Sequence, residues 1–156
     1  MKLIETSAEL LPFIAGEDGI YKMIERAGRT CYKSTDKITK DSAKPFVDRM
    51  IKSGHTAMLE HGTVYLKIPI LERTSYRIDS YNSNPYTKTK IGRMEGNPFY
   101  YYIVSNLRVL QENNWLDDLQ YLCSPTEFHE KRYTFRMVTS IGVTRELNRH
   151  KLLCVA

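Results

Sequence analysis

The stretch GTVYLKIPIL, residues 62–71, alternates apolar and more polar side chains, and it decides how the rest of the chain must pack. One face would carry four large apolar side chains, those of Val64, Leu66, Ile68 and Ile70. The other face would carry the side chains of Thr63, Tyr65 and Lys67. A period of two residues is typical of a β-strand that a hydrophobic core covers on one side. We therefore expect a half-covered strand here, with other elements packed on its apolar face.

Two helices are expected before this strand. In residues 19–32 the apolar positions recur at helical spacing, with Asp18 as a candidate N-cap and Gly28 as the stop. A second helix is expected in SAKPFVDRMIKSGH, where the apolar stripe consists of Phe46, Val47, Met50 and Ile51. Pro45 is tolerated in the first turn of this helix, and Gly54 would end it.

The second half of the chain mixes helices and strands. Residues 79–98 are rich in Asn, Ser, Gly, Pro and Lys, which predicts a long surface loop. A strand is expected at 99–106, followed by a helix that Asn106 caps. Further elements expected are a helix at 115–123, a strand at 132–140 and a helix from Thr144 to the end. Without a regular βαβ rhythm the fold class is α+β: a mixed or antiparallel sheet packed with helices in a single domain, 1–156.

The composition is that of a basic globular protein. The chain has 156 residues, a net charge of +5 and eleven tyrosines, and a positive charge favours an anionic partner. No apolar run approaches the ~20 residues of a membrane helix, and no basic leader precedes an apolar stretch, so we expect a cytoplasmic protein. Three isolated cysteines, Cys31, Cys123 and Cys154, indicate buried reduced thiols rather than a disulfide framework or a zinc site.

The segment TRELNRH gathers charged groups near the C-terminus. On a helix, Arg145 and Arg149 would be neighbours on one face, with Glu146 and His150 forming a parallel pair and Lys151 adding a cation. Guanidinium groups early in a helix suit contact with phosphate. The alternative is a solvated face on which Glu146 pairs with its neighbours.

A second group of polar residues lies in GHTAMLEHG, between the second helix and the strand. His55, Glu60 and His61 could suggest a metal, but their spacing fits neither His-Glu-x-x-His nor a zinc finger. We therefore expect no metal. These histidines are expected to form hydrogen bonds, either within the fold or to a ligand.

These segments together resemble the flavin-dependent thymidylate synthases. The similarity covers most of the chain, through residues 27–34, 53–68 and 112–150 in that order, and is especially close to a longer-looped branch of the family. The family signature begins with an Arg-His-Arg run, and its first two positions match Arg149 and His150. The Gly-His and Glu-His pairs of the GHTAMLEHG segment form a second, independent match.

The resemblance implies a function and a set of contacts. Family members methylate dUMP to dTMP, taking the methylene from methylenetetrahydrofolate and a hydride from FAD that NADPH has reduced. By position, the cofactor FAD would contact His55, Arg149, His150 and Lys151. The substrate dUMP would contact Glu146 and Arg149. The resemblance also implies a homo-oligomer, a tetramer whose active site is assembled from several subunits.

The sequence departs from the family pattern in three places. Lys151 replaces the second arginine, so a bidentate phosphate contact becomes a point charge. Cys154 stands where a serine is expected, and the chain ends at Ala156 before the family's Gln/Glu, Ser and Arg-Tyr. We therefore expect a C-terminally truncated member with impaired activity. A natural short paralogue is the alternative.

A non-catalytic nucleotide- or nucleic-acid-binding protein of the same fold is the competing hypothesis. The basic residues of 88–93, beside Tyr81, Tyr86 and the tyrosines at 100–102, would suit stacking of a single strand. No nucleic-acid-binding motif accompanies them, which favours a solvated basic loop. We therefore do not expect nucleic acid as a partner.

Overall fold

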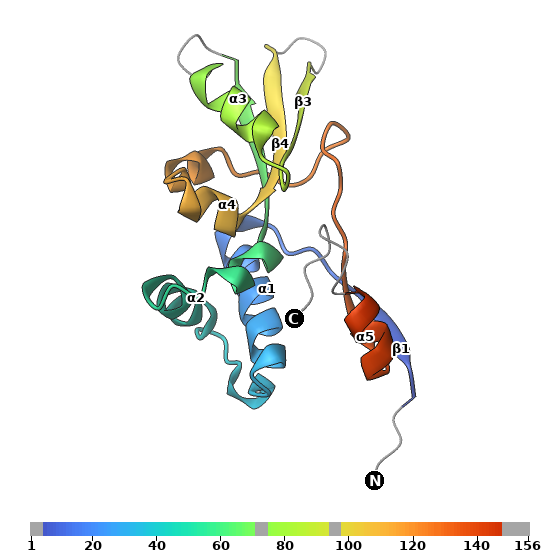
Figure 1. The fold of residues 1–156 in the computed structure, drawn as a ribbon. Helices are drawn as coiled ribbons and strands as arrows, with labels where there is room; N and C mark the ends of the chain where they lie inside the picture. The colour runs from blue at the N-terminus through green and yellow to red at the C-terminus, as the bar shows by residue number, and fades with distance from the viewer. Residues whose placement is uncertain (1–4, 71–74, 94–97, 148–156) are drawn as a thin grey trace.

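The computed structural model describes residues 5–70, 75–93 and 98–147, which fold into two antiparallel sheets with helices packed against them (Figure 1). The strands are β1 (Ser7–Leu11), β2 (Thr63–Pro69), β3 (Lys88–Gly92), β4 (Tyr100–Asn106) and β5 (Thr134–Val138). The α-helices are α1 (Gly16–Cys31), α2 (Ala43–Lys52), α3 (Ser75–Ser83), α4 (Leu107–Glu112) and α5 (Ile141–Leu147). Short 3-10 helices are η1 (Thr35–Lys37), η2 (Thr56–His61) and η3 (Leu116–Tyr121). The expected α+β class is confirmed.

The larger sheet has three strands in the order β2-β4-β3, all antiparallel. The predicted strand at 62–71 is confirmed over Thr63–Pro69 as β2, and Val64, Leu66 and Ile68 on one face are buried, whereas Ile70, expected on the same face, lies beyond the strand and is 37% exposed. Its other face is covered too, because Phe13 and His129 pack edge-on against Tyr65 with ring centroids 5.5 and 5.3 Å away. The strand is therefore more enclosed than the alternation alone predicts.

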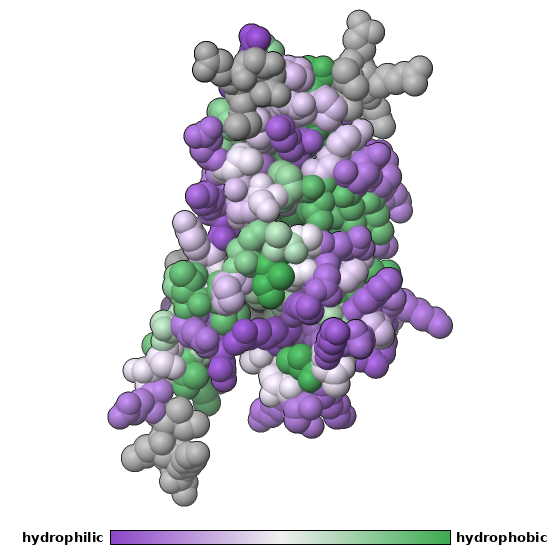
Figure 2. All heavy atoms as spheres, turned by 180° about the vertical axis from the view of Figure 1, so that it is seen from behind, coloured by the Kyte–Doolittle hydropathy of each residue, from purple (hydrophilic) through white to green (hydrophobic). Residues whose placement is uncertain are grey.

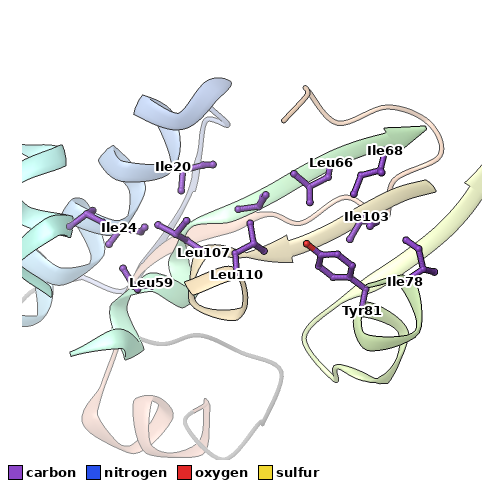
Figure 3. Packing of buried hydrophobic residues seen from close by; sticks show 12 residues of the cluster. Ile20, Ile24, Leu59, Leu66, Ile68, Ile78, Tyr81, Ile103, Leu107 and Leu110 are labelled. Carbon is purple, nitrogen blue, oxygen red and sulfur yellow. The ribbon is translucent and has the colours of Figure 1, made fainter. Parts of the chain in front are cut away.

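A single core joins this sheet to the helices (Figure 3). Ile20 and Ile24 of α1 and Val47 of α2 meet the apolar face of β2, while Leu107 and Leu110 come from α4. Tyr81 of α3 closes the core at the β3 end, where its hydroxyl donates to Asp118 at 2.7 Å. The core thus runs from the three-stranded sheet, where α3 and α4 pack, to α1 and α2 beyond its end (Figure 1).

The prediction of a long loop at 79–98 is wrong. Residues up to Ser83 continue helix α3, and KTKIG forms the edge strand β3 on β4. Residues 94–97 lie outside the described residues. Polar and turn-forming residues dominate this segment, but Tyr81, Thr87 and Gly92 are buried, and this tertiary burial overrides the loop-like composition.

Both ends of α1 differ from the prediction. The helix begins at Gly16, after Ala15, so Asp18 lies inside the first turn and pairs with Lys22 at 2.6 Å instead of capping. Gly28 does not stop the helix. A Cβ built on Gly28 would lie 2.5 Å from the Phe46 ring, so the glycine is what lets α2 approach α1 closely.

The remaining predicted elements are confirmed, but some have a different type of helix or begin at a different residue. Asn106 caps α4 by accepting a hydrogen bond from the Val109 N–H at 3.0 Å. The helix expected at 115–123 is a 3-10 helix, η3, whose Leu119 packs on the core. Helix α5 begins at Ile141, before Thr144, and its expected continuation to Ala156 lies outside the described residues.

Three helices end with the same hydrogen-bond pattern but with different residues at the left-handed position. In the Schellman motif the residue after the C-cap has positive φ, which favours glycine. Gly54 has this role after α2 with φ 71°, and Asn114 has it after α4 with φ 59°. After α1 the position is taken by Lys33, with φ 49°. Positive φ strains the backbone of a lysine more than that of the glycine or asparagine at the other two helix ends.

The smaller sheet is a two-stranded ribbon of β1 and β5, and β1 was not predicted from the sequence. Its pairing runs from Ser7 opposite Val138 to Leu11 opposite Thr134. Figure 2 shows apolar side chains gathered along the part of the molecule where Figure 1 places β1 and α5. The exposed apolar side chains of this region are those of Leu10, Phe135, Met137, Ile141 and Val143. No helix among the described residues is long and apolar enough to cross a membrane.

Candidate functional site

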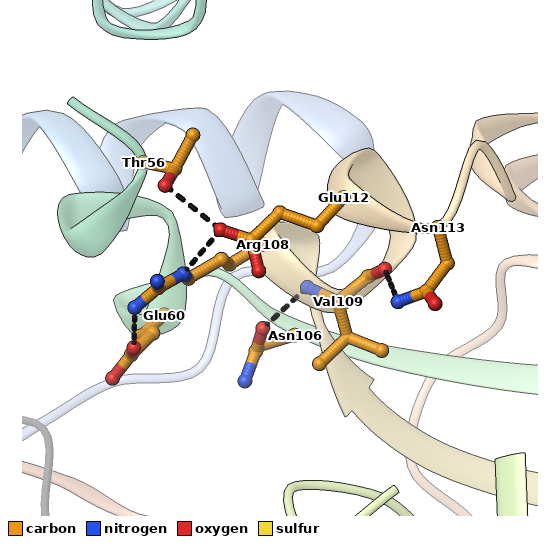
Figure 4. A network of polar contacts seen from close by, with 7 residues as sticks. All are labelled: Thr56, Glu60, Asn106, Arg108, Val109, Glu112 and Asn113. Atoms are coloured by element: carbon orange, nitrogen blue, oxygen red, sulfur yellow. Dashed lines mark hydrogen bonds and ion pairs between the residues drawn. The ribbon is translucent and has the colours of Figure 1, made fainter. Parts of the chain in front are cut away.

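The GHTAMLEHG segment forms the turn before η2 and η2 itself, and its three polar residues have different surroundings. His55 is exposed and begins η2, held through its backbone N–H, which donates to the Met50 carbonyl at 3.0 Å. Glu60 forms an ion pair with Arg108 of α4, and Arg108 also donates to Glu112 at 2.7 Å (Figure 4). Glu60 therefore ties η2 to α4.

His61, the third polar residue, lines a pocket of about 400 Å³ beside the ribbon. We call this the His61 pocket, and its walls include Leu10, Phe13, Ile20, Met23, Tyr65 and Tyr133. Burial lowers the pKa of His61, and the neighbouring Glu60 opposes this only in part. The imidazole is therefore neutral at physiological pH and can both donate and accept a hydrogen bond.

Polar groups stand at one side of the His61 pocket. Arg132 is among its lining residues, and its backbone N–H donates to the Tyr65 hydroxyl at 2.8 Å. The Arg132 guanidinium donates to the Ser105 carbonyl at 3.1 Å and to the Tyr86 carbonyl at 2.5 Å, so it holds the segment before β5 against the larger sheet. Lys131 lines the same side. A mainly apolar pocket with a few polar groups is the usual form of a small-molecule site.

A second hollow, of about 630 Å³, runs along α1 and shares Pro12, Ile14 and Met23 with the His61 pocket. We call it the α1 groove. Four basic side chains line it, those of Lys22, Arg26, Lys33 and Arg136. The two hollows are therefore neighbours with a common apolar wall, and basic side chains line the second of them.

The C-terminal candidates are only partly described. Glu146 is exposed in α5, and neither it nor His55 is among the residues that line the two hollows. Arg149, His150 and Lys151 lie outside the described residues. The pairing of His55 with the Arg149–Lys151 run stays a prediction.

The competing hypothesis of a stacking platform around residues 88–93 loses two of its rings. Tyr81 and Tyr102 are buried, and Tyr102 stacks on Phe128 with centroids 4.7 Å apart. Of the tyrosines named for stacking, Tyr86 is 39% exposed. The Tyr100 ring already has the Lys67 ammonium over it at 4.3 Å from the centroid. Two of the expected rings are therefore closed to a nucleobase.

The prediction of buried reduced thiols is wrong at Cys31 and holds in part at Cys123, while Cys154 lies outside the described residues. Cys31 is exposed at the end of α1, so a buried thiol there is wrong, while Cys123 is half-buried and free. Burial raises the pKa of the Cys123 thiol, which keeps it protonated. Within the described ranges no three His, Cys, Asp or Glu side chains come together as a metal site.

The α1 groove was not predicted from the sequence, although the spacing of some of its residues could have indicated it. Lys22, Arg26 and Thr30 are spaced by four residues and so share one face of a helix. Lys33 and Arg136 join them only through the helix end and the pairing of β5 with β1, which no local pattern predicts. No family model, curated protein or solved structure matches the chain.

Proposed function

We propose that this protein is a flavin-dependent thymidylate synthase, which binds FAD and dUMP and transfers a methyl group to dUMP. One observation carries the proposal beyond the sequence resemblance: an apolar pocket with aromatic side chains in its wall adjoins a cationic hollow. FAD and dUMP both combine a planar ring with phosphate, so both need an apolar and a cationic surface in contact. The volumes lie within the ~300–1,000 Å³ of typical ligand sites.

The residues of the His61 pocket fit a flavin or uracil ring. Phe13 and Tyr133, which are 46% and 66% exposed, offer aromatic surface, and Met23 and Leu10 add apolar surface to the wall. Neutral His61 can donate to a ring carbonyl or accept from a ring N–H, whereas an imidazolium could only donate. Bound FAD would supply the hydride chemistry, while this chain binds, orients and shields the ring.

Other parts of the proposal follow from the resemblance. NADPH and methylenetetrahydrofolate are the proposed co-substrates, the homo-oligomer is a tetramer, and the compartment is the cytoplasm. Basic composition and the cationic hollow support a phosphorylated substrate but do not distinguish these details.

FAD titration of the purified protein tests the proposal. We expect flavin absorbance to remain with the protein after gel filtration and FAD fluorescence to change on binding. If neither FAD nor dUMP binds, the proposal fails. If FAD binds but dUMP, methylenetetrahydrofolate and NADPH yield no dTMP, enzymatic function fails and a non-catalytic nucleotide-binding protein of the same fold takes its place.

Two histidines of the same segment make a matched pair for locating the ring. His61→Gln removes the imidazole from the pocket, and we expect FAD affinity to fall about five- to tenfold, the usual effect of one hydrogen bond. His55→Gln changes an exposed residue that lines neither hollow. A loss with His55→Gln and none with His61→Gln would place the ring at the contact that the resemblance implies, outside the His61 pocket.

A further inference from the structure

The α1 groove brings basic side chains of α1 and the turn after it together with one from the distant strand β5. Lys22 and Arg26 are one turn apart on α1, Lys33 follows its C-terminus, and Arg136 comes from the middle of β5. Threonines 30, 35 and 39 also line the groove, so hydroxyl groups stand among the cations. Cations that converge from distant segments on one hollow require a fold to bring them together, unlike a run of charges on one solvated helix face.

The acidic groups near the groove compensate only part of this charge, and they do so through long or exposed ion pairs. Glu25 is buried and already bound, by Arg29 at 3.2 Å and by the Ser42 hydroxyl at 2.9 Å. Glu9 is shared between Arg26 at 3.9 Å and Arg136 at 3.8 Å, distances at the outer limit of an ion pair. Asp18 pairs with Lys22 at 2.6 Å, but both side chains are well exposed and screened by water. An anion in the groove would therefore gain contacts that the protein's own carboxylates do not make.

The backbone at Lys33 supplies independent support. Gly54 and Asn114 occupy the equivalent position after α2 and α4, and both residue types tolerate positive φ. Lysine does not tolerate it as well, and it adds neither packing nor a cap here, because its side chain is exposed. Strained residues that persist without a structural gain cluster at ligand sites. Lys33 is one of the residues that line the groove, so the strained turn adds a basic residue to it.

The apolar wall of the groove is shared with the His61 pocket. Pro12, Ile14 and Met23 belong to both hollows, so a ligand that crosses this apolar wall can reach both. We infer that the α1 groove binds the phosphate of a ligand whose planar ring lies in the His61 pocket, with Lys22, Arg26, Lys33 and Arg136 as the phosphate-binding residues. This inference rests on the proposed function, because FAD and dUMP are the two sources of phosphate that it considers.

Paired ligands with and without phosphate test the inference. FAD is compared with riboflavin and dUMP with deoxyuridine, in the wild-type protein and in Arg26→Gln and Arg136→Gln. Each substitution removes one exposed cation from the groove. We expect about a tenfold loss of affinity for the phosphorylated ligand and a change of less than twofold for its phosphate-free partner. Lys90→Gln, an exposed cation on β3 outside both hollows, is the matched control.

The pattern of losses identifies the source of the phosphate. A loss confined to FAD assigns the groove to the dinucleotide pyrophosphate, and a loss confined to dUMP assigns it to the nucleotide monophosphate. Equal losses in the Lys90→Gln control, or no loss in either groove variant, overturn the inference while leaving the proposed function standing.

Inorganic pyrophosphate separates the inference from the proposed function. If FAD and dUMP do not bind but pyrophosphate does, with the same dependence on Arg26 and Arg136, the proposed function fails and the groove remains a phosphate site. If pyrophosphate, FAD and dUMP all fail to bind at low salt, both fail. Lys33→Gly removes a groove cation at a position whose positive φ suits glycine, and thermal unfolding of this variant shows whether a loss of affinity occurs in a folded protein.

Discussion

The three-stranded sheet and the two-stranded ribbon differ in how much of their surface is buried. Four successive residues of β4, from Tyr102 to Ser105, are buried, and helices and loops cover both faces of the sheet. In the ribbon, Leu11 is buried, but Leu10, Phe135 and Met137 are about half exposed. A two-stranded ribbon has little stability of its own. We conclude that the buried sheet accounts for most of the stability of the fold, whereas residues of the ribbon line both hollows.

The largest expected effect contrasts one large side chain from each region. Ile103→Ala would leave a cavity in the centre of β4 and destabilise the fold by about 2–5 kcal/mol, because Ile103 is fully buried. Phe135→Ala on β5 removes a side chain that is 54% exposed, and we expect a loss below about 1 kcal/mol. Urea unfolding measures both. Equal losses of stability would contradict the difference between sheet and ribbon, because Phe135 would then contribute to the fold as much as a core residue does.

A smaller effect is expected at the cap between β4 and α4. Asn106→Ala leaves the Val109 N–H without its side-chain acceptor, so we expect the free energy of unfolding to fall by about 1 kcal/mol. Asn106→Asp keeps an acceptor and should restore most of that stability. If Asn106→Asp is as unstable as Asn106→Ala, the buried environment of the residue and not the cap sets the cost.

Lys33→Gly tests backbone strain and ligand binding at the same position of the α1 groove. Glycine accepts the positive φ, so we expect a gain of about 0.5–1 kcal/mol in stability, together with weaker binding of phosphorylated ligands. The equivalent change in the opposite sense, Gly54→Ala after α2, should lose a similar amount. Thermal unfolding checks both, and a destabilised Lys33→Gly variant would contradict the strain argument.

Each region contains a histidine whose pKa burial lowers, His129 on the sheet and His61 beside the ribbon. Burial lowers the pKa of His129, which packs on the sheet, although its hydrogen bond to the Leu66 carbonyl at 3.0 Å opposes the shift. Below about pH 6.5 the unfolded chain therefore binds more protons than the folded one, so stability falls with acidification and is fully present above that pH.

Urea unfolding as a function of pH measures this contribution. His129→Gln should flatten the loss of stability between pH 6.5 and the lowered folded-state pKa. His61→Gln should flatten it separately, since burial lowers the pKa of His61 as well. Unchanged pH dependence in both variants would show that neither imidazole is neutral because of burial.

Local patterns predicted the elements that local chemistry determines. The alternation in β2, the apolar stripe of α2 and the Asn106 cap each depend on neighbouring residues, and all three are confirmed. Gly28 was misjudged because its meaning comes from Phe46, a residue in another helix. Strand β3 was read as loop because its partner β4, and not its composition, makes it a strand.

The candidate site was predicted less completely than the fold. His61 belongs to a segment that the sequence singled out, and it lines a pocket. The α1 groove depends on the pairing of β1 with β5 and on a lysine at a position where glycine is usual, and neither follows from residue spacing. Contacts between residues far apart in the chain, such as Arg26 and Arg136 around Glu9, were beyond the reach of sequence patterns.

Mapping FAD on the ¹⁵N-labelled protein by NMR tests the central claim most directly, because both regions carry exposed cations. The claim is that the ribbon side, not the sheet edge, binds the phosphorylated ligand. We predict that FAD shifts the backbone amide signals of Ile14, Arg26, Lys33 and Arg136 and leaves those of β3 unchanged. Shifts concentrated on Lys88–Gly92, with the groove signals unmoved, would contradict it.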